Sequence, residues 1–236
     1  MTLPTLSAPK FKAKLSDGRQ IEYRPFVVKE EKVLLMALES GDMTAKISAV
    51  LDLVEACTFG KINVEILTLA EIVSLIIKIR TKSVGESAVF SLRCETKDCN
   101  HHHELTLDLS KVGLTKSTNT TNKIMLNDET GIMLKIPTIK DQMISDLKEM
   151  DLADRAIDLI ALHIESVFTA ESSTNRKDVS NEELTDFVHQ LTREQIKTIN
   201  DWIVSEPQLL EVIEFKCEKC GETTSVELKG FDDFFV

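Results

Sequence analysis

Apolar and polar residues change their spacing several times along the first third of the chain. Alternation on both sides of Asp17-Gly18 is typical of a β-hairpin with its turn at the glycine. Helical spacing follows, with Asp42 placed as an N-cap and with Thr68 and Glu71 placed as a capping box. These patterns predict a hairpin over residues 11–23 and helices over residues 29–40, 42–57 and 68–82.

The rest of the chain mixes short strands with helices. Strand-like arms flank the segments CETKDCNHHH and CEKCGE, and KIMLNDETGIMLKIP has the pattern of a further hairpin. Helices are expected in pieces from about residue 140 to about residue 169, followed by a polar loop over residues 171–178. Capping boxes at Ser180 and Thr192 then introduce the helical segment that carries Trp202.

We predict an α+β protein with a helical body, small β-hairpins and a zinc-ribbon-like module closed by two distant cysteine pairs. The expected divisions are a loose arm at 1–9, an N-terminal hairpin plus helices at 10–87, ribbon hairpins at 88–110 and 210–230, a hairpin plus helical insertion at 123–206, and an apolar-acidic tail at 231–236.

Composition narrows the class of protein. The chain has 236 residues, is 42% hydrophobic and carries a formal net charge of -11. It can therefore bury a proper core, but it lacks the basic surface that nucleic-acid binding needs. Its N-terminus has no apolar signal-peptide core, and its longest apolar stretch, 66–79, is interrupted by Glu71 and Lys78. We therefore expect a cytosolic chain without a membrane span.

Four of the five cysteines form two close pairs, each at the tip of a predicted hairpin. The predicted metal ligands are Cys94, Cys99, Cys217 and Cys220. Zinc prefers four tetrahedral ligands, and thiolates suit it well. Gly221 follows the second pair, where a positive φ lets backbone N–H groups turn toward sulfur. The fifth cysteine, Cys57, lies in an apolar helical pattern and is expected to pack in the core.

The neighbouring histidine triplet leaves the ligand set open. His101, His102 or His103 could replace Cys99 as a ligand, although we favour a solvated start of a strand for all three. A zinc ion with four protein ligands has no position left for water or substrate. The site is therefore expected to be structural, with its binding energy contributing to folding.

One pattern favours an enzyme instead. His163-Ile164-Glu165 followed by Cys217-x-x-Cys220 is similar to the short signature of zinc-dependent nucleoside deaminases. Against this hypothesis, His163 is expected in the middle of an apolar helix, and Lys216 stands where the signature has proline. The scheme also leaves the first cysteine pair unused. We therefore predict a protein that is not an enzyme and has no catalytic residues.

Two segments are candidate partner-binding surfaces. One contains Tyr23, Arg24, Pro25 and Phe26 and leads into a helix that is apolar almost continuously from 33 to 38. Such a helix must be covered on more than one side, either in its own core or by a partner. The other is the tail, with Phe231, Phe234 and Phe235. The tail either packs on its own domain or enters a groove of another subunit.

The segment YRPFVVKEEKVLLMALES, residues 23–40, resembles the baseplate hub subunit family of T-even-like contractile-tailed bacteriophages and related marine phages. The chain length and the late CxxCG hairpin fit this resemblance. It implies a late protein of virion morphogenesis that helps build the tail hub in the host cytoplasm through contacts with other tail proteins. It leaves open whether the protein stays in the virion baseplate or acts as a transient assembly chaperone.

Overall fold

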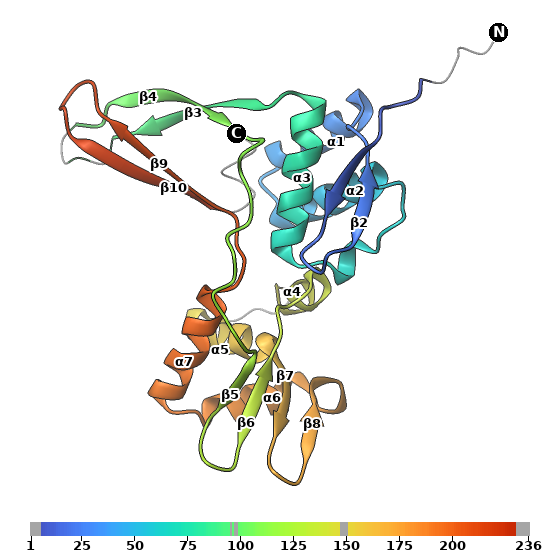
Figure 1. Cartoon of the computed structure of the whole chain (residues 1–236), viewed down its shortest axis with the longest axis vertical. Coiled ribbons are helices and arrows are strands. Elements are labelled where there is room, and N and C mark those ends of the chain that lie inside the picture. Colours follow the sequence, from blue (N-terminus) through green and yellow to red (C-terminus); the bar gives the residue numbers. More distant parts are fainter. Residues whose placement is uncertain (1–5, 95, 97–98, 147–150, 230–236) are drawn as a thin grey trace. The chain divides into compact units, whose positions relative to one another are not determined.

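The computed structural model of the chain describes residues 6–94, 96, 99–146 and 151–229, and it divides into two compact units (Figure 1). Unit 1 combines Met1–Thr115 with Gln208–Val236, and unit 2 is Lys116–Pro207. The predicted insertion at 123–206 lies inside unit 2. The predicted tail at 231–236 and most of the predicted arm at 1–9 lie outside the described residues.

Unit 1 begins with a hairpin and three helices. Its elements are β1 (Phe11–Lys14), β2 (Gln20–Tyr23), α1 (Val28–Glu39), α2 (Met43–Cys57), the short 3-10 helix η1 (Val64–Ile66) and α3 (Leu69–Ser83). The predicted turn is present, with Gly18 at φ +87°. The Asp42 side chain accepts from the amides of Thr44 and Ala45 and so caps α2. These local signals explain why the sequence placed the helices correctly.

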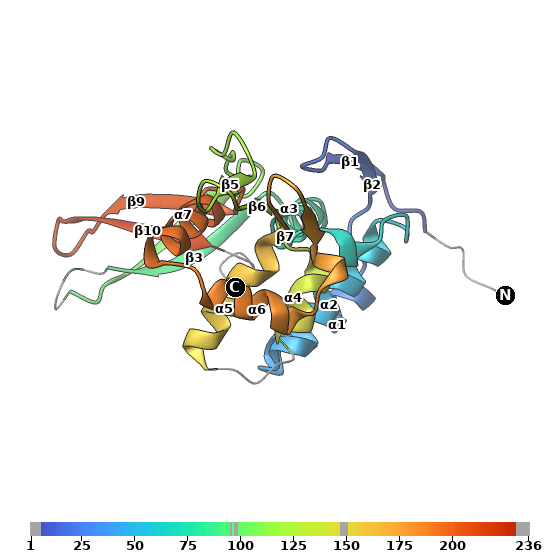
Figure 2. The same ribbon diagram turned by 90° about the horizontal axis from the view of Figure 1, so that it is seen from below.

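Two more hairpins complete unit 1. They are β3 (Ser87–Arg93) with β4 (His102–Asp108), and β9 (Leu210–Lys216) with β10 (Thr223–Lys229). Both hairpins are antiparallel, and they lie side by side in Figure 1 and again in Figure 2. An isolated bridge between Leu114 and Leu209 joins the segments that lead out of one hairpin and into the other. The two hairpins therefore meet although they are far apart in the sequence.

A hydrophobic cluster holds these hairpins against α3. Val73 and Ile77 from the helix belong to one buried cluster with Phe90 from β3, Phe215 from β9 and Leu228 from β10. The inward positions of β3 alternate strictly with exposed ones, as expected for a strand with one covered face. This cluster fixes the positions of both hairpins and hence of their tips.

Unit 2 is a four-stranded antiparallel sheet with helices. Its elements are β5 (Lys123–Met125), β6 (Gly131–Leu134), α4 (Ile139–Asp146), α5 (Leu152–His163), β7 (Ile164–Phe168), β8 (Ser173–Asn175), the 3-10 helix η2 (Arg176–Asp178), α6 (Asn181–His189) and α7 (Arg193–Val204). The strand order is β5-β6-β7-β8. Its core includes Ile132, Ile164 and Trp202, and the Trp202 indole donates to the Thr121 carbonyl at 2.9 Å. Both predicted capping boxes in this unit are present.

Two predictions in this region were wrong. The helical pieces do not continue to residue 169, because α5 ends at His163 and Ile164–Phe168 forms strand β7. The predicted loop at 171–178 contains strand β8 and η2. The segment IESVF begins with alternating buried and exposed side chains, ends with two half-buried ones, and pairs with β6. Pairing across the sheet therefore overrides the apparent helical continuity.

Glu71 links the first hairpin to α3. Its carboxylate accepts the Thr68 amide at 3.0 Å in the capping box and the Ser16 amide at 3.2 Å, and it also accepts the Ser16 hydroxyl. The residue is buried, with 6% of its surface exposed. We expect Glu71→Ala to lower the unfolding free energy by about 2 kcal/mol, because it removes the capping box and the hydrogen bonds from Ser16 that join the hairpin to α3. Hydrogen exchange of the α3 amides measures this loss.

Glu183 is the matched control, because it occupies the same capping-box position on α6 but is exposed. Glu183→Ala should destabilise α6 less than Glu71→Ala destabilises α3, because water can replace the bond that Glu183 accepts from the Ser180 amide. Equal costs for the two variants would contradict the buried role assigned to Glu71.

Candidate metal centre

Each cysteine pair lies where a hairpin reverses direction. Cys94 directly follows β3 and its amide donates to the His101 carbonyl at 2.8 Å. Cys217 directly follows β9, its amide donates to the Glu222 carbonyl at 2.8 Å, and its carbonyl accepts the Gly221 amide at 2.8 Å. Gly221 has φ +75°, a conformation that glycine adopts without strain. These backbone bonds form the two tight turns that carry the sulfurs.

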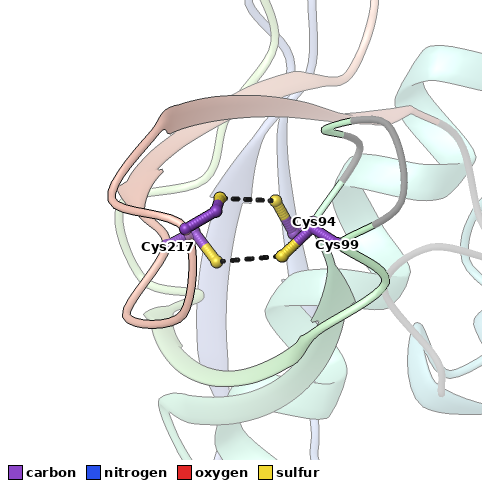
Figure 3. Close-up of side chains that lie close together, drawn as sticks. Cys94, Cys99 and Cys217 are labelled. Atoms are coloured by element: carbon purple, nitrogen blue, oxygen red, sulfur yellow. Dashed lines mark hydrogen bonds between the residues drawn. The ribbon is translucent and has the colours of Figure 1, made fainter.

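The two turns bring the four predicted cysteines together. All four Sγ atoms lie within 4.8 Å of one another. Cys94 and Cys220 are 3.8 Å apart at sulfur, and Cys99 and Cys217 are 3.7 Å apart. A tetrahedral ion with metal–sulfur bonds of about 2.3 Å has sulfurs about 3.8 Å apart, so the spacing fits a four-thiolate site. Figure 3 shows Cys94 and Cys99 facing Cys217.

The cluster is mostly shielded from solvent. Cys94, Cys99 and Cys217 are buried, whereas Cys220 is exposed. The Thr224 hydroxyl, itself buried, lies 3.5 Å from the Cys94 sulfur. The four cysteines could therefore hold a metal ion in a site that is closed by protein on most sides.

The cysteine thiols differ in pKa. Hydrogen bonds from the Thr224 and Thr96 side chains lower the pKa of Cys94 to about 6. At Cys99 the His101 amide lowers the pKa, but burial and the neighbouring thiols outweigh it and raise the pKa to about 11. The Glu222 amide is the main cause that lowers the pKa of Cys220. Four negative sulfurs repel one another, so protons remain on part of the cluster until a cation displaces them.

One neighbour departs from the sequence prediction. We predicted a solvated strand start for all three histidines, but His103 is buried, with its Nε2 3.3 Å from the Cys217 sulfur. Its ring also packs on Phe215 at a centroid distance of 4.9 Å. His102 is exposed, as predicted. The three histidines stand in a row where a strand begins, and successive side chains of a strand point to opposite faces. This alternation was the sequence signal that one of them could be buried.

The candidate binding segment before α1 is only partly on the surface. Tyr23 is buried, and Pro25 and Phe26 are half-buried. Arg24 contacts both carboxylate oxygens of Glu30, at 2.9 and 2.7 Å, which raises the pKa of Arg24 and lowers the pKa of Glu30. Partner contact by this segment stays a prediction. The tail residues Phe231, Phe234 and Phe235 lie outside the described residues.

The residues of the deaminase signature are distributed over both units. Cys217 and Cys220 belong to unit 1, whereas His163 and Glu165 belong to unit 2. His163 is the last residue of α5 rather than the middle of a helix, which corrects the sequence prediction. It is buried and its Nδ1 lies 2.7 Å from the Leu159 carbonyl, while burial lowers its pKa. Glu165 is exposed on β7.

Comparison with known proteins identifies the family. The family model described as T4 bacteriophage base plate protein matches residues 8–236. The chain belongs to this T4 base plate family. The match supports the resemblance noted for residues 23–40 and extends it over almost the whole chain, both ribbon hairpins included. Neither the curated proteins nor the solved structures contain a match.

Membership of this family indicates a structural phage protein of the virion tail that contacts other phage proteins. Within the described residues, every helix is too short or too polar to cross a lipid bilayer.

The four-thiolate site predicts a distinct pattern of thiol reactivity. In the metal-loaded protein at pH 8, we expect iodoacetamide to label none of the five cysteines quickly. After chelation, Cys94 and Cys220 should become reactive because their pKa values are lowered, whereas Cys99 should react slowly because its pKa is about 11. Cys57 should stay protected, because burial raises its pKa to about 12 and leaves about one molecule in ten thousand as thiolate at that pH. Mass spectrometry of the labelled peptides measures each site.

Cys57 thus serves as an internal control, and a Cys94→Ser, Cys99→Ser double variant provides the second test. The double variant should lose the metal, because half of the ligand set is gone. Full metal retention in this variant would contradict the four-thiolate site.

Proposed function

We propose that this T4 base plate family protein is a non-enzymatic subunit of the baseplate hub, or a factor that assembles the hub, and that it acts through protein–protein contacts in the host cytoplasm. The observation that carries the proposal is an apolar helix face on α1 that the described residues of unit 1 leave uncovered. A transient chaperone that is absent from the virion is the alternative within the same class.

The α1 face is defined by four apolar side chains. They are Val28, Val33, Leu35 and Met36, which are 51% to 80% exposed. At 3.6 residues per turn they cover an arc of about 160° around the helix, and Leu34, the buried residue of α1, lies opposite the middle of that arc. The expectation that α1 is covered on more than one side is therefore not met within the described chain. An apolar patch of this kind is typical of a protein interaction site.

The charged residues on the α1 face indicate what kind of partner surface would fit it. Lys29 and Lys32 are exposed on the same arc in the first half of α1, and Glu39 is exposed on it at the end of the helix. The first half of the face therefore suits an apolar partner surface that carries carboxylates.

The segment before the helix holds this face in place. The Arg24 amide donates to the Cys57 carbonyl at the end of α2, and the Phe26 amide donates to the Ser83 hydroxyl at the end of α3. Glu30 then accepts the Val27 amide at 2.9 Å while it pairs with Arg24. The residues that carry the family resemblance thus divide into buried anchors and an exposed apolar face. Such an arrangement presents a rigid helix to a partner.

The metal centre supports a role without catalysis. Four thiolates at tetrahedral spacing suit zinc, and such a site leaves no open position for water or substrate. We infer that zinc is the ion and that it joins two distant hairpins, as expected for a structural site.

Substitutions on α1 test the proposed contacts. A Val33→Glu, Met36→Glu double variant should fold normally, because both side chains are exposed, yet lose its co-purifying baseplate proteins in infected cells. We expect phage yield to fall by roughly tenfold or more, because each lost apolar contact is worth about 1.5 kcal/mol. Circular dichroism checks the fold, and plaque counts measure the yield.

Val89→Glu is the matched control, since Val89 is an exposed apolar residue of the same unit on strand β3. It should leave co-purification and yield unchanged. Equal losses for both variants would contradict a specific role of α1.

The composition of mature particles separates the two roles. We expect mass spectrometry of purified virions to detect the chain in the baseplate if it is a hub subunit. Its absence from virions, together with its presence in assembly intermediates, would identify the transient chaperone. Deamination of cytidine or adenosine that is lost in Glu165→Ala would overturn the non-enzymatic assignment.

A further inference from the structure

A second group of metal-ligating side chains lies beside the four cysteines. Within the described residues, His101, His103 and Glu218 each offer one ligand atom, and the three atoms lie within 4.8 Å of one another. None of them belongs to the four-thiolate set. His103 is buried, His101 is half-buried and Glu218 is exposed, so the group leads from the ribbon core out to solvent.

The hairpin turns account for this grouping. His103 is the second residue of β4 and His101 directly precedes the strand, and their rings meet edge to face with centroids 4.6 Å apart. Residues two apart in an extended chain have side chains on the same face. Glu218 follows Cys217 in the turn of the other hairpin. The same contact that brings the cysteines together therefore brings a carboxylate to the two imidazoles.

The contact with Cys217 links the tautomer of His103 to metal binding. When Cys217 is a metal-bound thiolate it only accepts hydrogen bonds, so the His103 Nε2 atom, 3.3 Å from the sulfur, then carries the proton. Nδ1 then holds the lone pair of the neutral ring and is available as a ligand atom. Bound at Nδ1, a cation makes the Nε2 proton a stronger donor to the thiolate.

Charge also favours a second cation at this place. Four thiolates around one divalent ion carry a net charge of -2, and Glu218 adds another negative charge. The exposed Lys219, whose ammonium lies 3.3 Å from the Cys99 carbonyl, offsets part of this charge. A second divalent ion would therefore be attracted by the first centre rather than repelled by it.

We propose that His101, His103 and Glu218 form a second divalent metal site, adjacent to the four-thiolate centre and with a fourth position open to solvent. Two imidazoles and a carboxylate select a first-row transition ion such as Zn²⁺ or Co²⁺ over Mg²⁺ or Ca²⁺. Ligand atoms about 2.05 Å from such an ion lie about 3.3 Å apart. The distances between the three ligand atoms, which are at most 4.8 Å, must therefore shorten by up to about 1.5 Å when the ion binds. The exposed Glu218 side chain has the freedom for this movement.

Metal stoichiometry tests the proposal. The purified full-length chain, stripped of metal and then dialysed against buffered Co²⁺, should bind two ions per chain by elemental analysis. His101→Ala and Glu218→Gln should each bind one ion and should weaken the second site by more than about 100-fold. Neither residue is a ligand of the four-thiolate centre. The thiolate-to-cobalt absorption of that centre should therefore persist in both variants.

His102→Ala and Glu222→Gln are the matched controls. His102 belongs to the same triplet but is exposed, with Nδ1 3.5 Å from the Ser91 hydroxyl, and Glu222 is an exposed glutamate near the same turn. Both controls should retain two ions.

Two results would overturn the second site. One is a single ion in the wild type that His101→Ala and Glu218→Gln leave unchanged. The other is a single ion that is lost in His103→Ala, which would make His103 a ligand of the first centre. Absence of the thiolate-to-cobalt absorption in the wild type would instead reject the four-thiolate centre, so the two failures are distinguishable.

Discussion

The contact between two hairpins that are distant in the sequence is the constraint on which the rest of unit 1 depends. Cys99 and Cys217, from opposite hairpins, are 118 residues apart in the chain and 3.7 Å apart at sulfur. Closing a loop of that length costs roughly 4 kcal/mol of chain entropy. The apolar cluster on α3 offsets this cost by burying Phe90, Phe215 and Leu228. Binding of a structural zinc ion would contribute about 10 kcal/mol or more to the free energy of folding, which exceeds the cost of closing the loop.

The same contact explains why the four cysteines have a histidine and a threonine beside them. Tight turns place sulfur at the hairpin tips, and strand alternation places His103 on the buried side of β4. The Cys217 sulfur therefore has the His103 imidazole within hydrogen-bond distance, and the Cys94 sulfur has the Thr224 hydroxyl within that distance. These neighbours orient the ligands of the first centre, and His103 also connects it to the proposed second site.

Local signals account for the parts of the fold that the sequence predicted well. Side-chain caps such as Asp42, Thr68 and Ser180 act within one turn of a helix, so they can be read without knowledge of the fold. The strand Ile164–Phe168 could not be read in this way, because its apolar residues continue from α5 and its partner β6 lies some 30 residues earlier in the sequence. Only pairing in the sheet ends the helix at His163.

The sequence by itself determined the four cysteines as a candidate ligand set, the turn glycine beside them and the family resemblance of residues 23–40. Only the tertiary structure decided that the sulfurs meet at tetrahedral spacing, that His103 is buried against Cys217, and that α1 leaves Val33 and Met36 exposed. The physical reason is that cap and turn signals depend on neighbours in the chain. Ligand geometry and burial depend instead on side chains that the chain brings together from more than 100 residues away.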